Sequence, residues 1–195
     1  MTGSQITNTD ITFAVYQDNR TVFRLKDIAM LTGETNFIVI NKKLNYLVQK
    51  GKLLNPRKGM YAKRGYSKEE FACSLFTPAY ISLEYVLQKA GVVFQYDSGI
   101  SSVSYLSRAV TVEEQLYSFR KIKNPILLNT TGIQRLKNHI NIASPERAFL
   151  DVMYLHKEYY FDNLNPLNAD LIYKLLPLYH SKALNARVTK TFSDA

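Results

Sequence analysis

Residues 22–33 read VFRLKDIAMLTG and residues 50–63 read KGKLLNPRKGMYAK, and these two stretches decide the fold of the first third of the chain. The first stretch predicts a short strand and a short helix that ends in a turn at Gly33. The second predicts a helix stop at Gly51 and a hairpin with its tip at 55–59. With a longer helix between them, this order predicts a winged helix-turn-helix.

The longer helix should begin near Thr35 or Asn36 and show two different faces. One face is apolar at helical spacing and is expected to point inward: Phe37, Ile40, Leu44, Leu47 and Val48. The opposite face is polar with one aromatic residue and is the candidate for the major groove of DNA: Thr35, Ile38, Lys42, Asn45, Tyr46 and Gln49.

The hairpin is expected to pair residues 52–54 with 60–62, and basic residues lie at its tip and just after it. Residues 1–66 hold 11 Lys or Arg and 4 Asp or Glu, whereas residues 67–195 hold 14 and 12. A basic patch on a helix-turn-helix is typical of a phosphate-binding surface, so the partner expected is double-stranded DNA. The candidate DNA-binding residues are Thr35, Asn36, Lys42, Lys43, Asn45, Tyr46, Gln49, Arg57, Lys58, Lys63 and Arg64.

The fold class expected is α+β, with a domain boundary in the hinge Arg64-Gly65-Tyr66-Ser67. Residues 1–66 would form the winged helix, and 67–195 a mixed α/β domain. In that second domain, helices are expected at 67–77, 80–89, 144–155 and 166–192, the last interrupted near Pro177. Short strands are expected at 103–106, 110–112, 116–119, 126–128 and 140–142.

Residue types that carry catalysis are scattered along the chain. The single Cys73 cannot form an intramolecular disulfide, which fits a reducing cytoplasm. The three histidines are not paired at a metal-binding spacing, and the glycines do not form a phosphate-binding loop.

No apolar run is long enough for a membrane span. The sequence therefore predicts a cytoplasmic protein that is not an enzyme and has no cofactor or metal, although an active site assembled from distant residues stays open.

Three segments together resemble the AbiEi family of antitoxins. LVQKGKL at 47–53, leading to RKGMYA at 57–62, resembles the end of that family's winged helix. YISLEYVLQKAG at 80–91 resembles a helix that follows a proline in the family, and ASPERAFLD at 143–151 resembles a helix start. In this order and spacing the resemblance covers the chain from about residue 22 to 157.

The resemblance implies a bacterial type IV antitoxin of an abortive-infection system that also acts as a transcriptional repressor. Its winged helix would bind inverted repeats in the promoter of its own operon. Its C-terminal domain would counter a nucleotidyltransferase-type toxin encoded beside it, without a stable complex between the two proteins. For the two helix motifs, at 80–91 and 144–151, we expect structural roles.

A second surface and several alternatives complete the expectations. Arg120, Lys121 and Lys123 follow Tyr117 and Phe119, and such a basic and aromatic mixture suits a nucleic-acid backbone or an acidic partner; this is the candidate antitoxin surface. A ligand-responsive winged-helix regulator, a protein-interaction adaptor and a nucleic-acid enzyme with a dispersed site are the alternatives left open.

Overall fold

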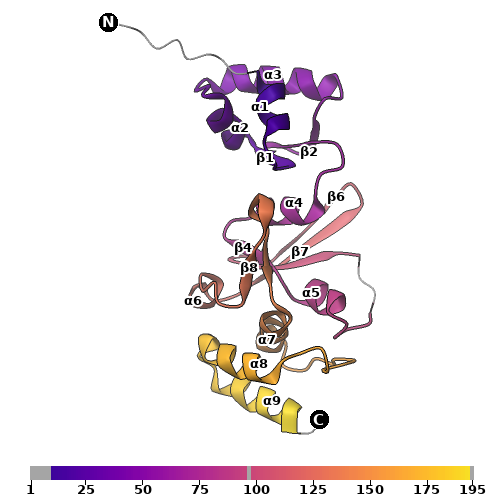
Figure 1. Cartoon of the computed structure of the whole chain (residues 1–195), viewed down its shortest axis with the longest axis vertical. Helices are drawn as coiled ribbons and strands as arrows, with labels where there is room; N and C mark the ends of the chain where they lie inside the picture. Colours follow the sequence, from indigo (N-terminus) through magenta and orange to yellow (C-terminus); the bar gives the residue numbers. More distant parts are fainter. Residues whose placement is uncertain (1–9, 96–97, 194–195) are drawn as a thin grey trace, which may run out of the picture. The chain divides into compact units, whose positions relative to one another are not determined.

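The computed structural model describes residues 10–95 and 98–193 of the chain. The protein is a mixed α+β structure (Figure 1). It divides into two compact units, residues 1–74 and residues 75–195, and each unit has its own sheet.

The first unit combines helices with a small antiparallel sheet in which β3 lies between β1 and β2. Asp10 caps the first helix by accepting a hydrogen bond from the backbone N–H of Thr12. The elements are α1 (Ile11–Gln17), β1 (Val22–Arg24), α2 (Leu25–Thr32), α3 (Phe37–Gln49), β2 (Leu54–Arg57), β3 (Met60–Ala62) and α4 (Lys68–Leu75).

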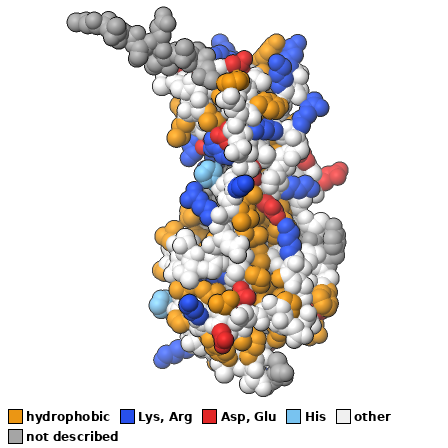
Figure 2. Space-filling view, viewed as in Figure 1, with side chains coloured by type: hydrophobic (Ala, Val, Ile, Leu, Met, Phe, Trp, Pro, Cys, Tyr) orange, Lys and Arg blue, Asp and Glu red, His pale blue; other side chains and the backbone are white. Residues whose placement is uncertain are grey.

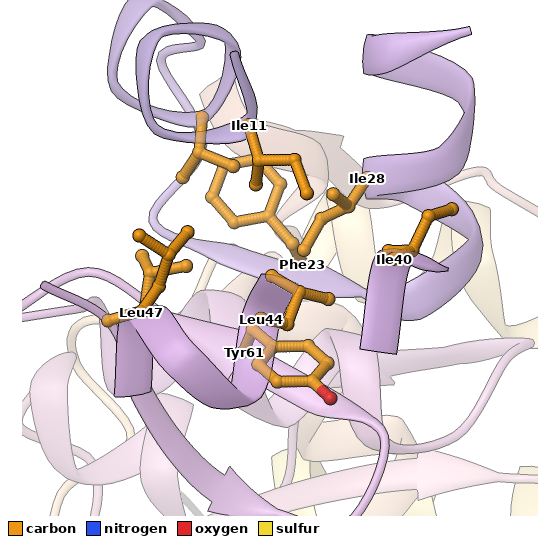
Figure 3. Close-up of a cluster of buried hydrophobic side chains, with 9 residues drawn as sticks. Ile11, Phe23, Ile28, Ile40, Leu44, Leu47 and Tyr61 are labelled. Atoms are coloured by element: carbon orange, nitrogen blue, oxygen red, sulfur yellow. The ribbon is translucent and has the colours of Figure 1, made fainter. Parts of the chain in front are cut away.

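Residues from the helices and the sheet form one hydrophobic core in the first unit (Figure 3). Ile40, Leu44 and Leu47 of α3 point into this core, as their helical spacing predicts. Phe37 was expected beside them, but half of its surface is exposed, because it is the first residue of α3 and lies a turn before Ile40. The cluster consists of Ile11, Val15, Phe23, Ile28, Ile40, Leu44, Leu47, Leu53 and Tyr61.

The β2–β3 hairpin has a shorter tip than the sequence indicated. Arg57 pairs with Met60, so the turn contains only Lys58 and Gly59, and Gly59 has a φ of +78°. Pro56 is tolerated inside β2 because this strand lies at the edge of the sheet. The side-chain Nδ2 of Asn55 donates to the carbonyl oxygens of Arg57 and Met60 and so holds the turn together.

The second unit is built around one mixed sheet with the strand order β6-β7-β5-β4-β9-β8. The β4–β9 and β5–β7 pairs are parallel, and the other neighbours are antiparallel. Its elements are β4 (Ala79–Ile81), α5 (Glu84–Lys89), β5 (Ile100–Ser104), β6 (Arg108–Val112), β7 (Gln115–Lys121), α6 (Asn124–Leu127), β8 (Ile133–Arg135), the 3-10 helix η1 (Lys137–His139), β9 (Asn141–Ala143), α7 (Pro145–Leu155), α8 (Ala169–Leu175), the 3-10 helix η2 (Leu176–Tyr179) and α9 (Lys182–Ser193).

The secondary structure of the second unit differs from the expectation at two segments. The helix expected at 80–89 begins only at Glu84, because Ala79–Ile81 is an interior strand with partners on both sides and Leu83 has a φ of +61°. The strand expected at 126–128 falls mostly within α6, where Pro125 occupies the first turn. The start of α7 is as expected, because Ser144 Oγ accepts from the N–H of Arg147 and Pro145 follows the cap.

Helix α4 belongs to the first unit, so the division of the chain falls at Ser74, eight residues after the expected boundary. Glu70 is almost fully buried, and its carboxyl group accepts hydrogen bonds from the N–H groups of Thr21 and Val22 and from Thr21 Oγ1. At the other end of α4, Arg24 Nε donates to the carbonyl oxygen of Ser74 at 3.0 Å. Both ends of the helix are therefore fixed to the β1 region, and Ser67, the last residue of the expected hinge, donates its N–H to Thr21 Oγ1.

We expect Glu70→Ala to lower the free energy of unfolding of the first unit by about 1–3 kcal/mol, because it leaves the N–H groups of Thr21 and Val22 without their acceptor. Urea denaturation measures the loss, and limited proteolysis should show faster cleavage between residues 64 and 70. Lys68→Ala, at an exposed position of the same helix, is the control and should change neither reading. Equal behaviour of the two variants would show that Glu70 does not hold α4.

Candidate nucleic-acid interface

Helix α3 exposes the face that the sequence assigned to DNA. The side chains on or beside it that face solvent are Thr35, Asn36, Ile38, Lys42, Lys43, Asn45, Tyr46 and Gln49. Ile38 and Tyr46 keep 68% and 57% of their surface exposed, so this face offers apolar contacts as well as polar ones. The face therefore combines two lysines, several amides, an isoleucine and a tyrosine, which are groups that can contact base edges and thymine methyl groups.

Asn36 has a different role from its neighbours on this face. Its Oδ1 accepts hydrogen bonds from the N–H groups of Ile38 at 3.0 Å and Val39 at 3.3 Å, and so caps the start of α3. The carboxamide oxygen is thereby engaged by the helix itself. Thr35, just before the cap, is exposed.

The turn of the β2–β3 hairpin presents basic side chains from a second element of the same unit. Lys58 is exposed in the turn, and Arg57, the last residue of β2, is half-buried. The bonds from Asn55 to both sides of this turn fix its backbone. A rigid turn reduces the conformational entropy that is lost when a ligand binds.

Lys63 and Arg64 do not lie at the hairpin turn, because they follow the opposite end of β3. Lys63 Nζ donates to the carbonyl oxygen of Asp18 at 2.6 Å and lies 5.7 Å from the centre of the Tyr16 ring. Arg64 Nε donates to the carbonyl oxygen of Gly51 at 3.0 Å, at the C-terminal end of α3. Both side chains are thus engaged within the unit, although Arg64 remains exposed.

The first unit has more basic than acidic residues. Residues 1–74 contain 12 Lys or Arg and 6 Asp or Glu, and residues 75–195 contain 13 and 10. Acidic side chains of the unit accept hydrogen bonds from other groups of the unit, among them Asp10, Asp18, Asp27, Glu34 and Glu70. The Arg20 guanidinium bonded to Asp18 lowers the pKa of that carboxyl group.

The basic side chains are more widely exposed than these acids. In the view of Figure 2, Lys and Arg side chains are spread over the first unit, with hydrophobic side chains exposed between them. Lys42, Lys43 and Lys58 are all exposed. Because α3 and the β2–β3 hairpin contain exposed lysines and no Asp or Glu, the charge that an anionic ligand would meet on them is positive.

The candidate surface in the second unit is formed only in part. Arg120, Lys121 and Lys123 are exposed, but Tyr117 and Phe119 are buried. Alternate residues of a strand point to opposite faces, and β7 turns both aromatic rings into the core. The expected combination of basic and aromatic groups on one surface is therefore wrong, and only the three basic side chains remain available.

A buried polar network in the second unit was not expected from the sequence. Arg147 and Asp151, one helical turn apart on α7, are both fully buried, with Arg147 Nε 3.6 Å from Asp151 Oδ1. The carboxyl group of Asp151 also accepts hydrogen bonds from Ser82 Oγ at 2.7 Å, Tyr179 Oη at 2.7 Å and Tyr80 Oη at 3.2 Å. These contacts join α7 to the end of β4 and to η2.

The network holds its charges away from solvent. Burial raises the pKa of Asp151, while Arg147 and the three hydroxyl donors act in the opposite direction. The Arg147 guanidinium also donates to the carbonyl oxygens of Ile126 and Thr131. Because Arg147 and Asp151 are inaccessible, we assign this network a structural role. The signal in the sequence was a charged pair at i, i+4 within the apolar helix at 145–155.

Comparisons with known proteins do not assign the chain to a family. No model of a known protein family matches the sequence, and no curated protein matches it either. Within residues 10–95 and 98–193, no cluster of three or more His, Cys, Asp or Glu is placed to hold a metal ion. In that same part of the chain, none of the helices has both the length and the apolar character needed to cross a bilayer.

We expect Asp151→Ala to destabilise the second unit by about 3–5 kcal/mol, because it leaves the buried Arg147 without its counter-charge. Asp170→Ala, at an exposed position in the first turn of α8, is the control and should cost less than about 1 kcal/mol. Chemical denaturation followed by circular dichroism measures both. A loss for Asp151→Ala as small as that of the control would contradict a stabilising role for the network.

Proposed function

We propose that the first unit is a winged helix-turn-helix that binds duplex DNA. The observation that carries this proposal is the exposed basic and amide-rich face of α3, followed in the chain by a rigid basic turn, with no Asp or Glu in the helix or the hairpin. In this proposal α2 and α3 are the helix-turn-helix, with the turn at Gly33, whose φ is +69°. The β2–β3 hairpin is the wing.

The two elements would have different roles on DNA. Helix α3 enters the major groove, where Lys42, Asn45 and Gln49 face base edges. Asparagine and glutamine suit adenine, and lysine suits guanine. Arg57 and Lys58 in the wing meet the phosphate backbone, which fixes position without reading sequence.

The resemblance to AbiEi antitoxins extends the proposal to the whole chain. We infer a cytoplasmic, non-catalytic repressor of its own promoter that also counters a nucleotidyltransferase-type toxin. The resemblance supports this with segments 47–62, 80–91 and 143–151, which form the α3–hairpin region, the β4–α5 segment and the capped start of α7. For the antitoxin activity, Arg120, Lys121 and Lys123 are the exposed residues that we propose.

We expect the full chain to bind its promoter duplex with an affinity that falls by orders of magnitude between ~50 and ~200 mM salt, if about five to eight phosphates are contacted. Arg57→Ala with Lys58→Ala should weaken binding to every duplex and reduce the salt slope by about 2. Lys42→Ala with Asn45→Ala should instead change the preferred sequence, because those side chains face bases.

Fluorescence anisotropy across a salt series and selection from a random duplex library measure the two effects. Lys157→Ala with Lys174→Ala removes the same charge from exposed positions of the second unit and should leave binding close to that of the wild type. DNA binding that ignores salt, or an unchanged sequence preference in the α3 variant, would contradict the proposed mode.

For the antitoxin activity we expect co-expression with a neighbouring nucleotidyltransferase to restore growth. Arg120→Glu with Lys121→Glu should abolish that rescue while DNA binding persists, because the variant reverses the charge only at the proposed surface. Rescue that survives in the folded variant would exclude this surface. Loss of rescue in the Lys42→Ala and Asn45→Ala variant would show that protection depends on DNA binding.

A further inference from the structure

Strand β6 is an open edge of the second sheet. It pairs with β7 through all five of its residues without a bulge, and no strand in the described part of the chain pairs with its outer side. The opposite edge, β8, is only three residues long. Short strands, bulges, prolines and charged side chains are features that usually prevent edge strands from pairing with another chain, and of these β6 has only a charged residue, Arg108, at its first position.

The hairpin that joins β6 to β7 determines which backbone groups point outward. Glu113 and Glu114 form its two-residue turn with φ values of +48° and +66°. In a hairpin of this kind the closing pair, here Val112 and Gln115, is hydrogen-bonded, and hydrogen-bonded pairs alternate along the ladder. The N–H and C=O groups of Ala109 and Thr111 therefore face away from β7.

The charges on β6 and its turn favour antiparallel pairing of two β6 strands over parallel pairing. Arg108 stands at the start of the strand, and the two glutamates of the turn follow its end. A second β6 in the antiparallel direction, paired about Val110, places Arg108 of each copy opposite Val112 of the other and so beside the acidic turn of Glu113 and Glu114. A parallel second strand would place like charges together.

We propose that β6 is a self-association edge, through which two copies of this chain pair about a two-fold axis at Val110. Ala109 of one copy exchanges backbone hydrogen bonds with Thr111 of the other, and the sheet continues from one copy into the next. The exposed side chains of Ala109 and Thr111 are small enough to allow this approach. Because the contact is isologous, it closes at two copies. It does not depend on whether the chain binds DNA.

The test is sedimentation velocity of the full chain over a wide range of protein concentrations. We expect a reversible dimer that weakens with salt. Ala109→Pro removes an outward N–H without taking a bond from β7 and should give a monomer, whereas Ala109→Ser keeps the N–H and should remain dimeric. A wild-type chain that stays monomeric throughout would overturn the proposal, as would a dimer that persists in folded Ala109→Pro.

Charge exchange provides a second test that does not require the proline variant to fold. Arg108→Glu should weaken self-association roughly tenfold. Adding Glu114→Arg to that variant should restore it, because the exchanged charges face each other again. A dimer unaffected by Arg108→Glu, or one that the second change does not restore, would mean that β6 is not the interface.

Discussion

The first unit depends on the hydrogen bonds that the carboxyl group of Glu70 accepts, because they join α4, its last helix, to the start of β1. The carboxyl group accepts hydrogen bonds from the N–H groups of Thr21 and Val22, where β1 starts. Strand β1 in turn pairs with β3, the middle strand of the small sheet. Thr21 takes part twice, since its hydroxyl donates to Glu70 and accepts from the N–H of Ser67. A local sequence pattern cannot show such a contact, because 49 residues separate its partners.

Features that depend on residues close together in the sequence could be predicted, whereas features that depend on distant partners could not. The buried face of α3 follows from the spacing of Ile40, Leu44 and Leu47, and the start of α7 follows from the Ser144 cap. The strand nature of Tyr80 and Ile81 could not be read in the same way, because it depends on partners at Val103 and Ile142 that complete an interior strand. The exposed face of α3 was predicted from periodicity alone, whereas the position of Lys63 depends on the distant Asp18.

The surface charge of the first unit depends on where its charged side chains lie as well as on how many there are. Asp27 and Glu34 bond to backbone N–H groups near helix starts, and Asp18 pairs with its neighbour Arg20. These carboxylates keep their charge, but they lie outside residues 37–62, which contain no Asp or Glu. Among the described contacts, Lys42 and Lys43 of α3 have no such bond, and Lys50, just after the helix, lies over the ring of Tyr46. This asymmetry is the physical basis for expecting an anionic partner.

The pairing of β4 with β9 has a consequence for the order in which the protein forms during synthesis. Ile81 meets Ile142, so the second sheet cannot close until the ribosome has released the chain well beyond residue 143. The hydrophobic cluster, the small sheet and the Glu70 contacts of the first unit all lie within the first 74 residues, so their parts leave the ribosome before most of the second unit is made. Contacts between residues so distant in sequence also form slowly, so we expect the second sheet to form after the first unit during translation.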